Sequence, residues 1–349
     1  MIDSNKRIRI GVICPSEIAI RRFMPALEIQ NNMTFSGVGI CGRDERANSS
    51  AMSDEEYAGR AEAQMAKART FVSKYGGHIY DTYKAVTAAD DNDAVYIPLP
   101  PALHYRWALK TLEQGKHVLL EKPATTSLDN TKTLVEVAQR KKLTLHENYM
   151  FLFHSQLEHI NQLIQSGEIG DIRLMRISFG FPRRAEADFR YNKQLGGGAL
   201  LDAGGYTIRY ATYLLGESAK LVHARANYCD NYDVDIYGSA VMENDGGQVA
   251  QLAFGMDNDY KCELEVWGSK GTLYTNRVLT APVGYEPIVR ISKNGIAEEI
   301  KLESDDSFRK SIEYFYSCIM DERIRQESYQ SILHQAELVE QFIQHSGLR

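Results

Sequence analysis

The first part of the chain alternates between short apolar runs and segments whose apolar residues recur with helical spacing. A short apolar run bounded by turn residues is typical of a strand buried on both faces, and the segments between the runs are long enough for crossover helices. The predicted strands are residues 6–14, 34–41, 94–98, 117–120 and 143–146. The predicted helices are residues 19–30, with a kink at Pro25, 102–114 and 129–141. Residues 44–74 are long enough for a helix plus an inserted surface segment around residues 49–60. This alternation predicts a doubly wound parallel α/β sheet of the Rossmann type.

The pattern changes near residue 150. A helix over residues 154–165 and a strand over 171–181 precede a glycine-rich turn and a helix over 202–215. The strands predicted after that helix are residues 219–228, 236–243, 248–256, 261–267 and 271–274. Short turns between successive strands favour antiparallel pairing. We therefore expect a dinucleotide-binding domain over residues 1–150 and, over residues 151–349, an α+β domain with a large, mostly antiparallel sheet, whose last helices could pack back on the first domain.

Composition and charge exclude several classes of protein. The 349 residues are 44% hydrophobic and carry a formal net charge of −6, which is enough apolar material for two cores. The absence of a long basic run argues against nucleic-acid binding, and no apolar stretch reaches the roughly 18 residues of a membrane span. Residues 1–9 lack the apolar core of a signal peptide, so we expect a cytoplasmic protein. The five cysteines have no paired or ligand-like spacing, which indicates reduced thiols and no metal site.

Lys122 and Tyr206 form a candidate proton-transfer pair. Lys122 ends an apolar strand and precedes Pro123, whose ring restricts the backbone on both sides, and a cis bond there would aim the ammonium sideways into a cleft. Tyr206 lies in the first turn of a later helix. An amine and a phenol that meet across a cleft could pass a proton to or from an alcohol or ketone oxygen. A surface lysine and a half-buried helix tyrosine are the alternatives.

The turn after the first strand lacks the glycines of a dinucleotide fingerprint. Such a turn needs small residues because the backbone must approach the pyrophosphate at the helix N-terminus. Cys14 and Ser16 stand where glycines are expected, and only Ala19 matches the fingerprint. With Pro15 and Ile18 these residues form the predicted pyrophosphate turn, and a plain strand-to-helix turn is the alternative.

The residues after the second strand favour NADP(H) over NAD(H). An NAD enzyme commonly places an acid there for the ribose hydroxyl, whereas an NADP enzyme leaves out that acid and supplies an arginine for the added phosphate. Gly42 occupies the acid position and Arg43 follows it. Asp44 would restore the acid if the register shifted by two residues, and a solvated loop arginine is the other alternative.

Four longer strings resemble one enzyme family. They are residues 96–104 (YIPLPPALH), 115–118 (GKHV), 121–123 (EKP) and 196–206 (GGGALLDAGGY). Together they resemble the glucose-fructose oxidoreductase, inositol dehydrogenase and rhizopine-catabolism family, Gfo/Idh/MocA. The resemblance implies a Rossmann domain, a C-terminal sheet that builds homodimers or homotetramers, and hydride transfer between a nicotinamide and a sugar-like carbinol. The Ile-Pro-Leu-Pro string and Tyr206 resemble NADPH-dependent 3-ketoreductases of nucleotide-linked deoxysugars, whereas inositol dehydrogenase-like members more often carry histidine at that position.

The same resemblance implies roles for individual residues. Lys122 would polarise the carbonyl oxygen, Tyr206 would protonate the developing alkoxide, and Asp202 would hold a sugar hydroxyl or orient Lys122, or else cap its helix. Beside Lys122, the cofactor cleft would be lined by Pro98, Leu99, Pro100, His104 and Glu121. The substrate would contact Tyr149, Arg190 and Tyr191. Packing is the alternative for Tyr149 and helix capping for His104. Arg183, Arg184 and Arg190, with Tyr191, lie in the loop before the glycine-rich turn and could meet a diphosphate, or else form a solvated basic loop.

The sequence leaves three functions open. The first is NADP-dependent reduction of a keto-sugar, with a nucleotide-linked sugar as the expected substrate. The second is oxidation of a free sugar, a cyclitol or a trans-dihydrodiol by the same residues in reverse. The third is a dinucleotide-binding sensor or scaffold without turnover. Only the glycine-poor turn favours the third function, and the presence of Lys122, Asp202 and Tyr206 argues against it.

Overall fold

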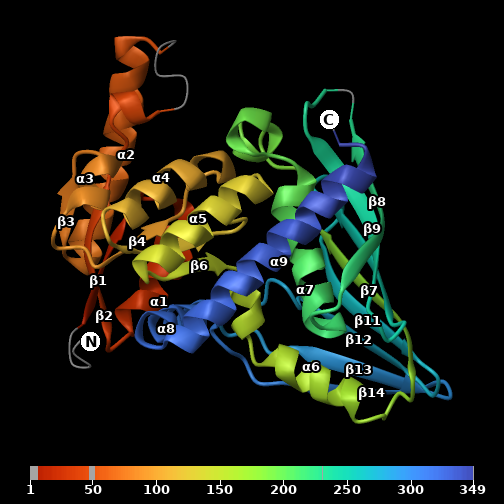
Figure 1. Ribbon diagram of the computed structural model, residues 1–349. Helices are drawn as coiled ribbons and strands as arrows, with labels where there is room; N and C mark the ends of the chain where they lie inside the picture. Colours follow the sequence, from red (N-terminus) through yellow and green to blue (C-terminus); the bar gives the residue numbers. More distant parts are fainter. Residues whose placement is uncertain (1–6, 47–51, 230, 349) are drawn as a thin grey trace. The chain divides into compact units, whose positions relative to one another are not determined.

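A computed structural model describes residues 7–46, 52–229 and 231–348 (Figure 1). The chain divides into two units. Unit 1 comprises Met1–Thr125, Asp129–Asn148 and Ser311–Leu333. Unit 2 comprises Thr126–Leu128, Tyr149–Lys310 and His334–Arg349. The last two helices, α8 (Ser307–Met320) and α9 (Glu322–Ser346), each contribute residues to both units.

Unit 1 contains a parallel sheet with the strand order β3-β2-β1-β4-β5-β6 in the described part of the chain. Its strands are β1 (Ile8–Val12), β2 (Met33–Gly39), β3 (His78–Tyr80), β4 (Ala94–Ile97), β5 (His117–Glu121) and β6 (Leu145–Asn148). Its helices include α1 (Met24–Glu28), α2 (Asp54–Tyr75), α3 (Tyr83–Ala88), α4 (Pro101–Glu113) and α5 (Leu128–Lys141). The order reverses between β1 and β4, as in a Rossmann fold, so the predicted fold of this part is confirmed.

The first helix of unit 1 begins with a wide turn. Residues Ala19–Phe23 are π-helical and continue directly into α1, where Pro25 lies at the second position. Because proline has no N–H to donate to the preceding turn, a widened turn before it accommodates the missing bond. The kink predicted at Pro25 therefore takes the form of a change in helix type.

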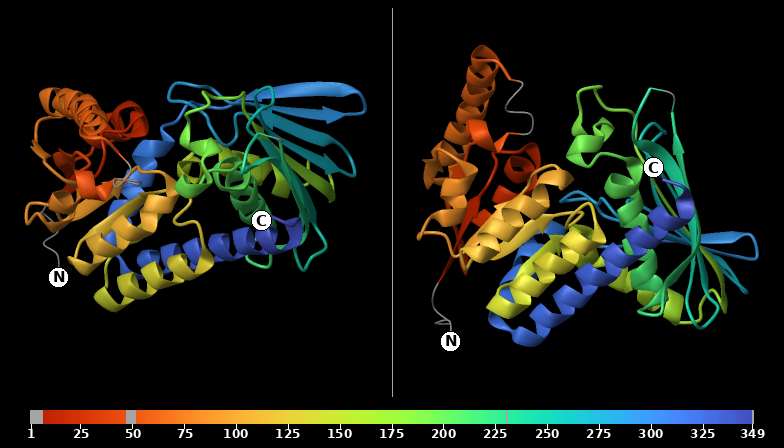
Figure 2. Two further views of the ribbon diagram at one scale, coloured as in Figure 1. Left: turned by 90° about the horizontal axis from the view of Figure 1, so that it is seen from above. Right: turned by 45° about the horizontal axis from the view of Figure 1, so that its top comes forward.

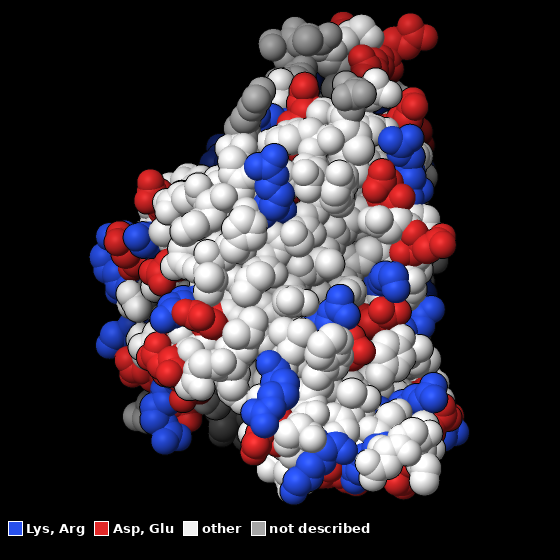
Figure 3. Space-filling model, turned by 90° about the vertical axis from the view of Figure 1, so that its right-hand side faces the viewer, with Lys and Arg blue, Asp and Glu red and all other residues white. Residues whose placement is uncertain are grey.

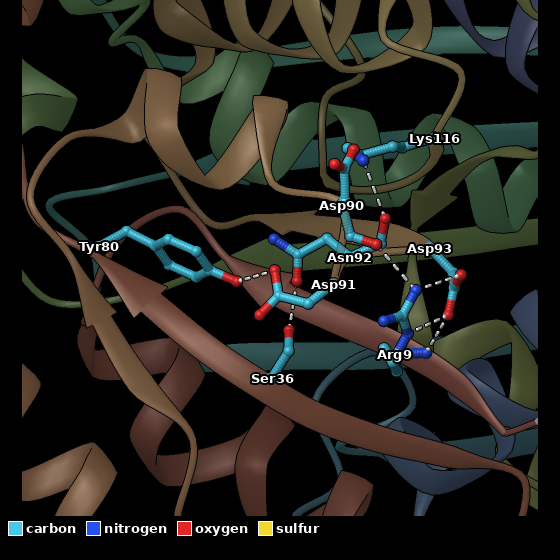
Figure 4. A network of polar contacts seen from close by, with 8 residues as sticks. All are labelled: Arg9, Ser36, Tyr80, Asp90, Asp91, Asn92, Asp93 and Lys116. Carbon is cyan, nitrogen blue, oxygen red and sulfur yellow. Dashed lines mark hydrogen bonds and ion pairs between the residues drawn. The ribbon is translucent and has the colours of Figure 1, made fainter.

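The amino edge of this sheet is held together by residues 89–93 (Figure 4). The Arg9 guanidinium donates to both carboxylate oxygens of Asp93, at 2.9 and 3.0 Å. The Asn92 amide oxygen accepts a hydrogen bond from Ser36, and its backbone carbonyl accepts one from Lys116 at 3.0 Å. These contacts join β1, β2 and the start of β5 at the edge opposite the carboxyl ends of the strands. In α/β sheets of this type, ligands bind at the edge formed by the carboxyl ends of the strands.

Unit 2 contains a large sheet with the order β14-β13-β12-β11-β7-β10-β9-β8 in the described residues. Only β7 and β10 pair in parallel among them. The strands are β7 (Ile172–Gly180), β8 (Lys220–Tyr228), β9 (Asp235–Glu243), β10 (Val249–Gly255), β11 (Lys261–Gly268), β12 (Thr272–Asn276), β13 (Ile288–Lys293) and β14 (Ile296–Lys301). The predicted mostly antiparallel sheet is confirmed. Strands β13 and β14 make it wider than predicted. β14 is mostly polar and exposed, whereas the alternating Val289 and Ile291 of β13 were a signal that the prediction missed.

One face of the large sheet forms the core of unit 2. Alternate residues of β7, β10 and β11, such as Ile177, Leu252 and Leu264, are buried against α7 (Gly205–Leu215), and α6 (Gln156–Gln165) adds Ile160 to the same core. Figure 2 shows α7 lying against this face. Figure 3 shows the opposite face, where uncharged side chains gather over a broad central area. Exposed apolar side chains of the sheet include Val222, Tyr237, Trp267, Tyr274 and Ile288.

We predict that His117 makes unit 1 sensitive to acid. Its Nδ1 accepts the Thr144 N–H at 2.9 Å, and burial together with the nearby Arg325 cation lowers its pKa to about 4. The pKa of histidine in the unfolded chain is about 6.5, so protonation of His117 favours the unfolded state. As the pH falls from 6.5 to 4, the free energy of unfolding should decrease by up to about 1.4 kcal/mol per pH unit because of this group.

Urea unfolding followed by circular dichroism at several pH values measures this slope. In His117→Gln an amide oxygen can still accept the Thr144 N–H but does not titrate, so the slope should become shallower. The exposed His159 provides a control, because His159→Gln should leave the slope unchanged. Equal slopes for wild type and His117→Gln would contradict the prediction.

Candidate active site

The turn after β1, where the sequence predicts a pyrophosphate site, takes its conformation without glycine. Among the described residues, none of positions 14–18 has a positive φ, so no left-handed residue is needed there. The Ser16 hydroxyl accepts a hydrogen bond from the Ala19 N–H at 3.2 Å and so caps the helix that follows. Burial raises the pKa of the Cys14 thiol, which keeps this side chain neutral. Pro15 is buried and Ile18 is half-buried on the same turn. A neutral turn at a helix N-terminus suits an anionic group.

The turn after β2 is organised by Glu45, which the sequence analysis missed. Its carboxylate accepts the backbone N–H groups of Gly42, Tyr83 and Lys84, each at 2.8 Å. The buried acid therefore ties this turn to the first turn of α3. An acid three residues after a helix-capping position was the available signal, since this is the spacing of a capping box.

Gly42 lies against two acids. A Cβ built on Gly42 would stand 3.2 Å from a Glu45 carboxylate oxygen and 3.3 Å from one of Asp44. A carboxylate side chain at position 42 would thus be crowded and repelled. Arg43 is exposed on the same turn, where it pairs with Asp54 and lies 5.5 Å from the Tyr57 ring.

Lys122 is anchored on both sides along the chain. Before it, the Glu121 carboxylate accepts hydrogen bonds from the Tyr96 hydroxyl at 2.7 Å and the Asn148 amide at 2.8 Å. Burial raises the pKa of Glu121, and these hydrogen bonds oppose that rise. The Lys122–Pro123 peptide bond is cis. After it, the Ala124 N–H donates to Glu147 at 2.7 Å. The backbone that presents the ammonium is therefore fixed by buried polar contacts.

His104 joins two segments of the predicted cofactor cleft. Its Nδ1 lies 2.8 Å from the Pro123 carbonyl oxygen and its Nε2 lies 2.7 Å from that of Leu99. The ring is 0% exposed, and burial lowers its pKa to about 4 although both carbonyls act in the opposite direction. His104 thus contacts backbone rather than solvent, and it holds the loop containing Pro98 and Pro100 beside the segment that follows Lys122.

In unit 2, Asp202 and Tyr206 occupy a helix that starts with a wide turn. Residues Leu200–Gly204 are π-helical and continue into α7. The buried Asp235 carboxylate accepts the Leu200 N–H at 2.7 Å and thereby fixes the start of this helix. Gly198 has a φ of +119°, and a Cβ there would lie 2.3 Å from the other Asp235 oxygen. The glycine-rich turn therefore allows the backbone to pass close to the carboxylate.

The Tyr206 ring rests on other aromatic rings. Its centroid lies 5.2 Å from that of Tyr149, 5.6 Å from Phe151 and 5.3 Å from Phe179. Tyr149 is only 1% exposed, and the Gln335 amide donates both to its hydroxyl, at 3.3 Å, and to the Gly205 carbonyl, at 2.9 Å. Tyr149 therefore supports Tyr206 from the core, a placement that matches packing rather than direct substrate contact.

Asp202 and Arg190 are partners of each other. The Arg190 Nε donates to Asp202 at 2.5 Å, and Nη1 donates to Asp188 at 3.1 Å. Burial disfavours the charge of Arg190, but the two carboxylates outweigh it and raise the pKa of this group. Tyr191, which follows, is half-buried, and its hydroxyl accepts the Arg184 N–H at 3.0 Å. Arg190 is thus engaged within the protein, and Asp202 is held by it one helical turn before Tyr206.

Within residues 7–46, 52–229 and 231–348, no three His, Cys, Asp or Glu side chains are grouped so that they could hold a metal ion. None of the described helices combines the length and apolarity needed to cross a membrane.

A Rossmann unit followed by a unit with a large antiparallel sheet defines a class of nicotinamide-dependent oxidoreductases. Residues 32–149 match the family model described as an oxidoreductase family with an NAD-binding Rossmann fold, and residues 157–274 match that of the GFO/IDH/MocA C-terminal domain. The chain belongs to the Gfo/Idh/MocA family and is an NAD(P)-dependent oxidoreductase.

Three relatives are similar over nearly the whole chain. Two are named dTDP-3,4-didehydro-2,6-dideoxy-alpha-D-glucose 3-reductase. The enzyme of Saccharopolyspora spinosa is 35% identical, over 96% of both chains. That of Actinomadura kijaniata is 37% identical, over 95% of this chain and 94% of the relative. The third is the crystal structure of KijD10, a 3-ketoreductase of A. kijaniata, in complex with NADP and TDP-benzene. It superimposes with a TM-score of 0.88 at 36% identity, covering 98% of both chains.

We predict that Gly205→Ala weakens both stability and activity. A Cβ at this position would lie 2.4 Å from the Tyr149 hydroxyl oxygen, so the ring that supports Tyr206 must move. Overpacking of this kind costs about 1–3 kcal/mol of unfolding free energy. Chemical denaturation and kcat measure the two effects. Gly59→Ala in α2 is the control, because a Cβ there meets nothing within 4 Å; if both variants behaved alike, the argument from Tyr149 would be wrong.

Proposed function

We propose that this protein reduces the ketone of a nucleotide-linked keto-sugar to an alcohol, with NADPH as the reductant. The observation that carries the proposal is the similarity, over nearly the whole chain, to enzymes named as dTDP-sugar 3-reductases. In the balanced reaction, the ketone gains a hydride on carbon and a proton on oxygen, and NADPH becomes NADP⁺. NADPH supplies the hydride from C4 of its nicotinamide.

Lys122 and Tyr206 are proposed to act on the same ketone oxygen. The ammonium of Lys122 would polarise the carbonyl and stabilise the negative charge that develops as hydride arrives. Tyr206 would then give its phenolic proton to that oxygen. A phenol gives up its proton only near pH 10 in water, and a neighbouring cation makes it a stronger acid. Support comes from the fixed backbone around Lys122 and the fixed ring of Tyr206.

Asp202 is proposed to position the substrate rather than to transfer a proton. The Asp202 carboxylate accepts a hydrogen bond from Arg190 and would accept a second one from a sugar hydroxyl. Arg190 would hold Asp202 in position. Tyr191 would hold the loop that carries both arginines, Arg184 and Arg190, through its hydrogen bond with the Arg184 N–H. Tyr149 would act by supporting the Tyr206 ring.

The turn after β2 supports NADPH as the preferred cofactor. A cofactor with a 2′-phosphate needs a position free of carboxylate side chains and a cation nearby. Gly42 leaves no room for an acid beside Glu45, and Arg43 is exposed next to it. Cys14, Pro15, Ser16, Ile18 and Ala19 would hold the pyrophosphate. Pro98, Leu99, Pro100, Glu121 and Lys122 would lie near the nicotinamide half, with His104 holding their loops together.

We expect Tyr206→Phe to lower kcat for keto-sugar reduction by about 10²-fold or more, because the proton donor is lost. The affinity for NADPH should change little, since the ring and its packing remain. Steady-state kinetics with a dTDP-linked 3-keto sugar and fluorescence titration of NADPH measure the two quantities. Tyr213→Phe removes an exposed hydroxyl from the same helix and should retain full turnover. Undiminished kcat in Tyr206→Phe would assign the proton to another group.

Arg43→Ala should abolish the preference for NADPH over NADH. Removing the guanidinium weakens NADPH binding while NADH, which lacks the 2′-phosphate, binds as before. Titration of both cofactors by nicotinamide fluorescence gives the ratio of dissociation constants. The matched control is Arg60→Ala in α2, an exposed arginine paired with Glu56. Equal affinities of the wild type for the two cofactors would contradict the assignment.

The same assays separate the other candidate functions. Oxidation of a free sugar, cyclitol or trans-dihydrodiol with NADP⁺ would indicate a dehydrogenase. Cofactor binding without turnover of any of these compounds would indicate a sensor or scaffold. The anchoring of Lys122 and Tyr206 in separate buried networks supports catalysis, since a scaffold does not need either group held in place.

We also propose that the outer face of the large sheet forms a homodimer or homotetramer. This face carries exposed Tyr237, Trp267 and Tyr274, and charged side chains are sparse over its centre (Figure 3). Apolar patches of this kind mark association surfaces. Sedimentation analysis of Trp267→Glu against wild type tests the proposal, because a charge in a packed interface should shift the assembly to monomers. A monomeric wild type would refute it.

The proposed setting for the reaction is the cytoplasm. All five cysteines are free thiols, and Cys41, Cys262 and Cys318 are buried. Reduced cysteines fit a reducing compartment.

A further inference from the structure

Two arginines on the loop after β7, Arg183 and Arg184, are exposed and form no ion pair with any described residue. The Arg183 guanidinium lies 5.2 Å from the Tyr232 ring, and that of Arg184 lies 5.2 Å from the Phe181 ring. Of the two acids in this loop, Asp188 is already paired with Arg190, and the exposed Glu186 forms no ion pair with any described residue. Exposed guanidinium groups without an acid partner are suited to phosphate oxygens.

The loop is connected to Tyr206 through a short series of aromatic contacts within unit 2. The Phe181 ring lies 5.8 Å from Phe179, and Phe179 lies 5.3 Å from Tyr206. The Arg184 backbone is held separately by the Tyr191 hydroxyl. The two arginines and the proposed proton donor are therefore parts of one packed structure. Their mutual placement does not depend on unit 1.

A pair of tyrosine rings lies beside the arginines. Tyr191 and Tyr232 have centroids 4.8 Å apart with an interplanar angle of 32°, and both rings are half-buried. A partly exposed aromatic ring next to a cation offers a surface on which a flat nucleobase can stack. The loop thus presents the two chemical features that a nucleoside diphosphate requires.

We propose that Arg183 and Arg184 bind the diphosphate of the substrate and that Tyr232 contacts its nucleobase. This inference rests on the proposed function, which supplies a nucleotide-linked sugar as the substrate. In such a sugar the diphosphate is attached at the anomeric carbon, a few bonds from a ring ketone, so a phosphate site near Tyr206 is required. Arg190, the arginine that the sequence favoured for substrate contact, instead serves to hold Asp202.

Titration of dTDP into the protein in the presence of NADP⁺ tests the site without the sugar. The double variant Arg183→Gln, Arg184→Gln should raise the dissociation constant for dTDP by about 10-fold or more per arginine, because each loses a charge-assisted contact. Each single variant should show part of the loss. Arg173→Gln, an exposed arginine of β7 that pairs with Asp171, is the matched control and should bind dTDP as wild type does.

Two further ligands separate the phosphate from the base. Inorganic pyrophosphate should lose affinity in the double arginine variant but not in Tyr232→Leu, whereas thymidine should lose affinity in Tyr232→Leu. With a dTDP-linked 3-keto sugar, the double variant should show a raised KM and a kcat within about 2-fold of wild type, as expected for uniform binding. Unchanged dTDP affinity in the double variant, or no dTDP binding by wild type, would overturn the inference.

The outcomes for the two proposals are distinguishable. If wild type reduces the keto-sugar and the double variant has the same KM, the proposed function stands and the diphosphate site is refuted. If dTDP binds through the two arginines but no keto-sugar is reduced, the site stands and the proposed function is refuted.

Discussion

The rigidity of the backbone around Lys122 is the constraint on which the active-site interpretation depends. An ammonium on a flexible side chain can act on one substrate oxygen only if its backbone is held still. Here the preceding Glu121 is bonded to Tyr96 and Asn148, and the following Ala124 is bonded to Glu147. These partners come from neighbouring strands of the parallel sheet, so the sheet itself determines where Lys122 is presented.

Unit 2 reaches a similar result by different means. Tyr206 is not held by a strand end but by the start of a helix, which the buried Asp235 fixes and the Tyr149 ring supports. Glycines at positions 198 and 205 make this packing feasible, because a Cβ at either would collide with Asp235 or Tyr149. The glycine-rich string that carried the family resemblance thus has a structural purpose close to the site.

The sequence analysis succeeded where a signal was local. The apolar runs gave the central strands, and the small residues at positions 14–19 marked a turn that proves to need no glycine. It was less successful where a residue acts through distant partners. The capping-box spacing indicates the bond of Glu45 to Gly42, but its bonds to the first turn of α3 and the pairing of Arg190 with Asp202 do not follow from the neighbouring residues. The short strand β3 and the polar strand β14 lacked an apolar pattern.

The sequence by itself determined the two-part α/β and α+β architecture and the family, and it predicted Lys122 and Tyr206 as the proton-transfer pair. These features follow from apolar periodicity and short motifs, which are patterns among residues close together in the sequence. Only the tertiary structure decided which side chains are already engaged and which are accessible. Burial of Tyr149 and His104 and the pairing of Arg190 with Asp202 arise from contacts between separate segments of the chain, and Arg183 and Arg184 form no ion pair with any described residue. Such contacts leave no periodic trace, because they depend on where the folded backbone brings each side chain.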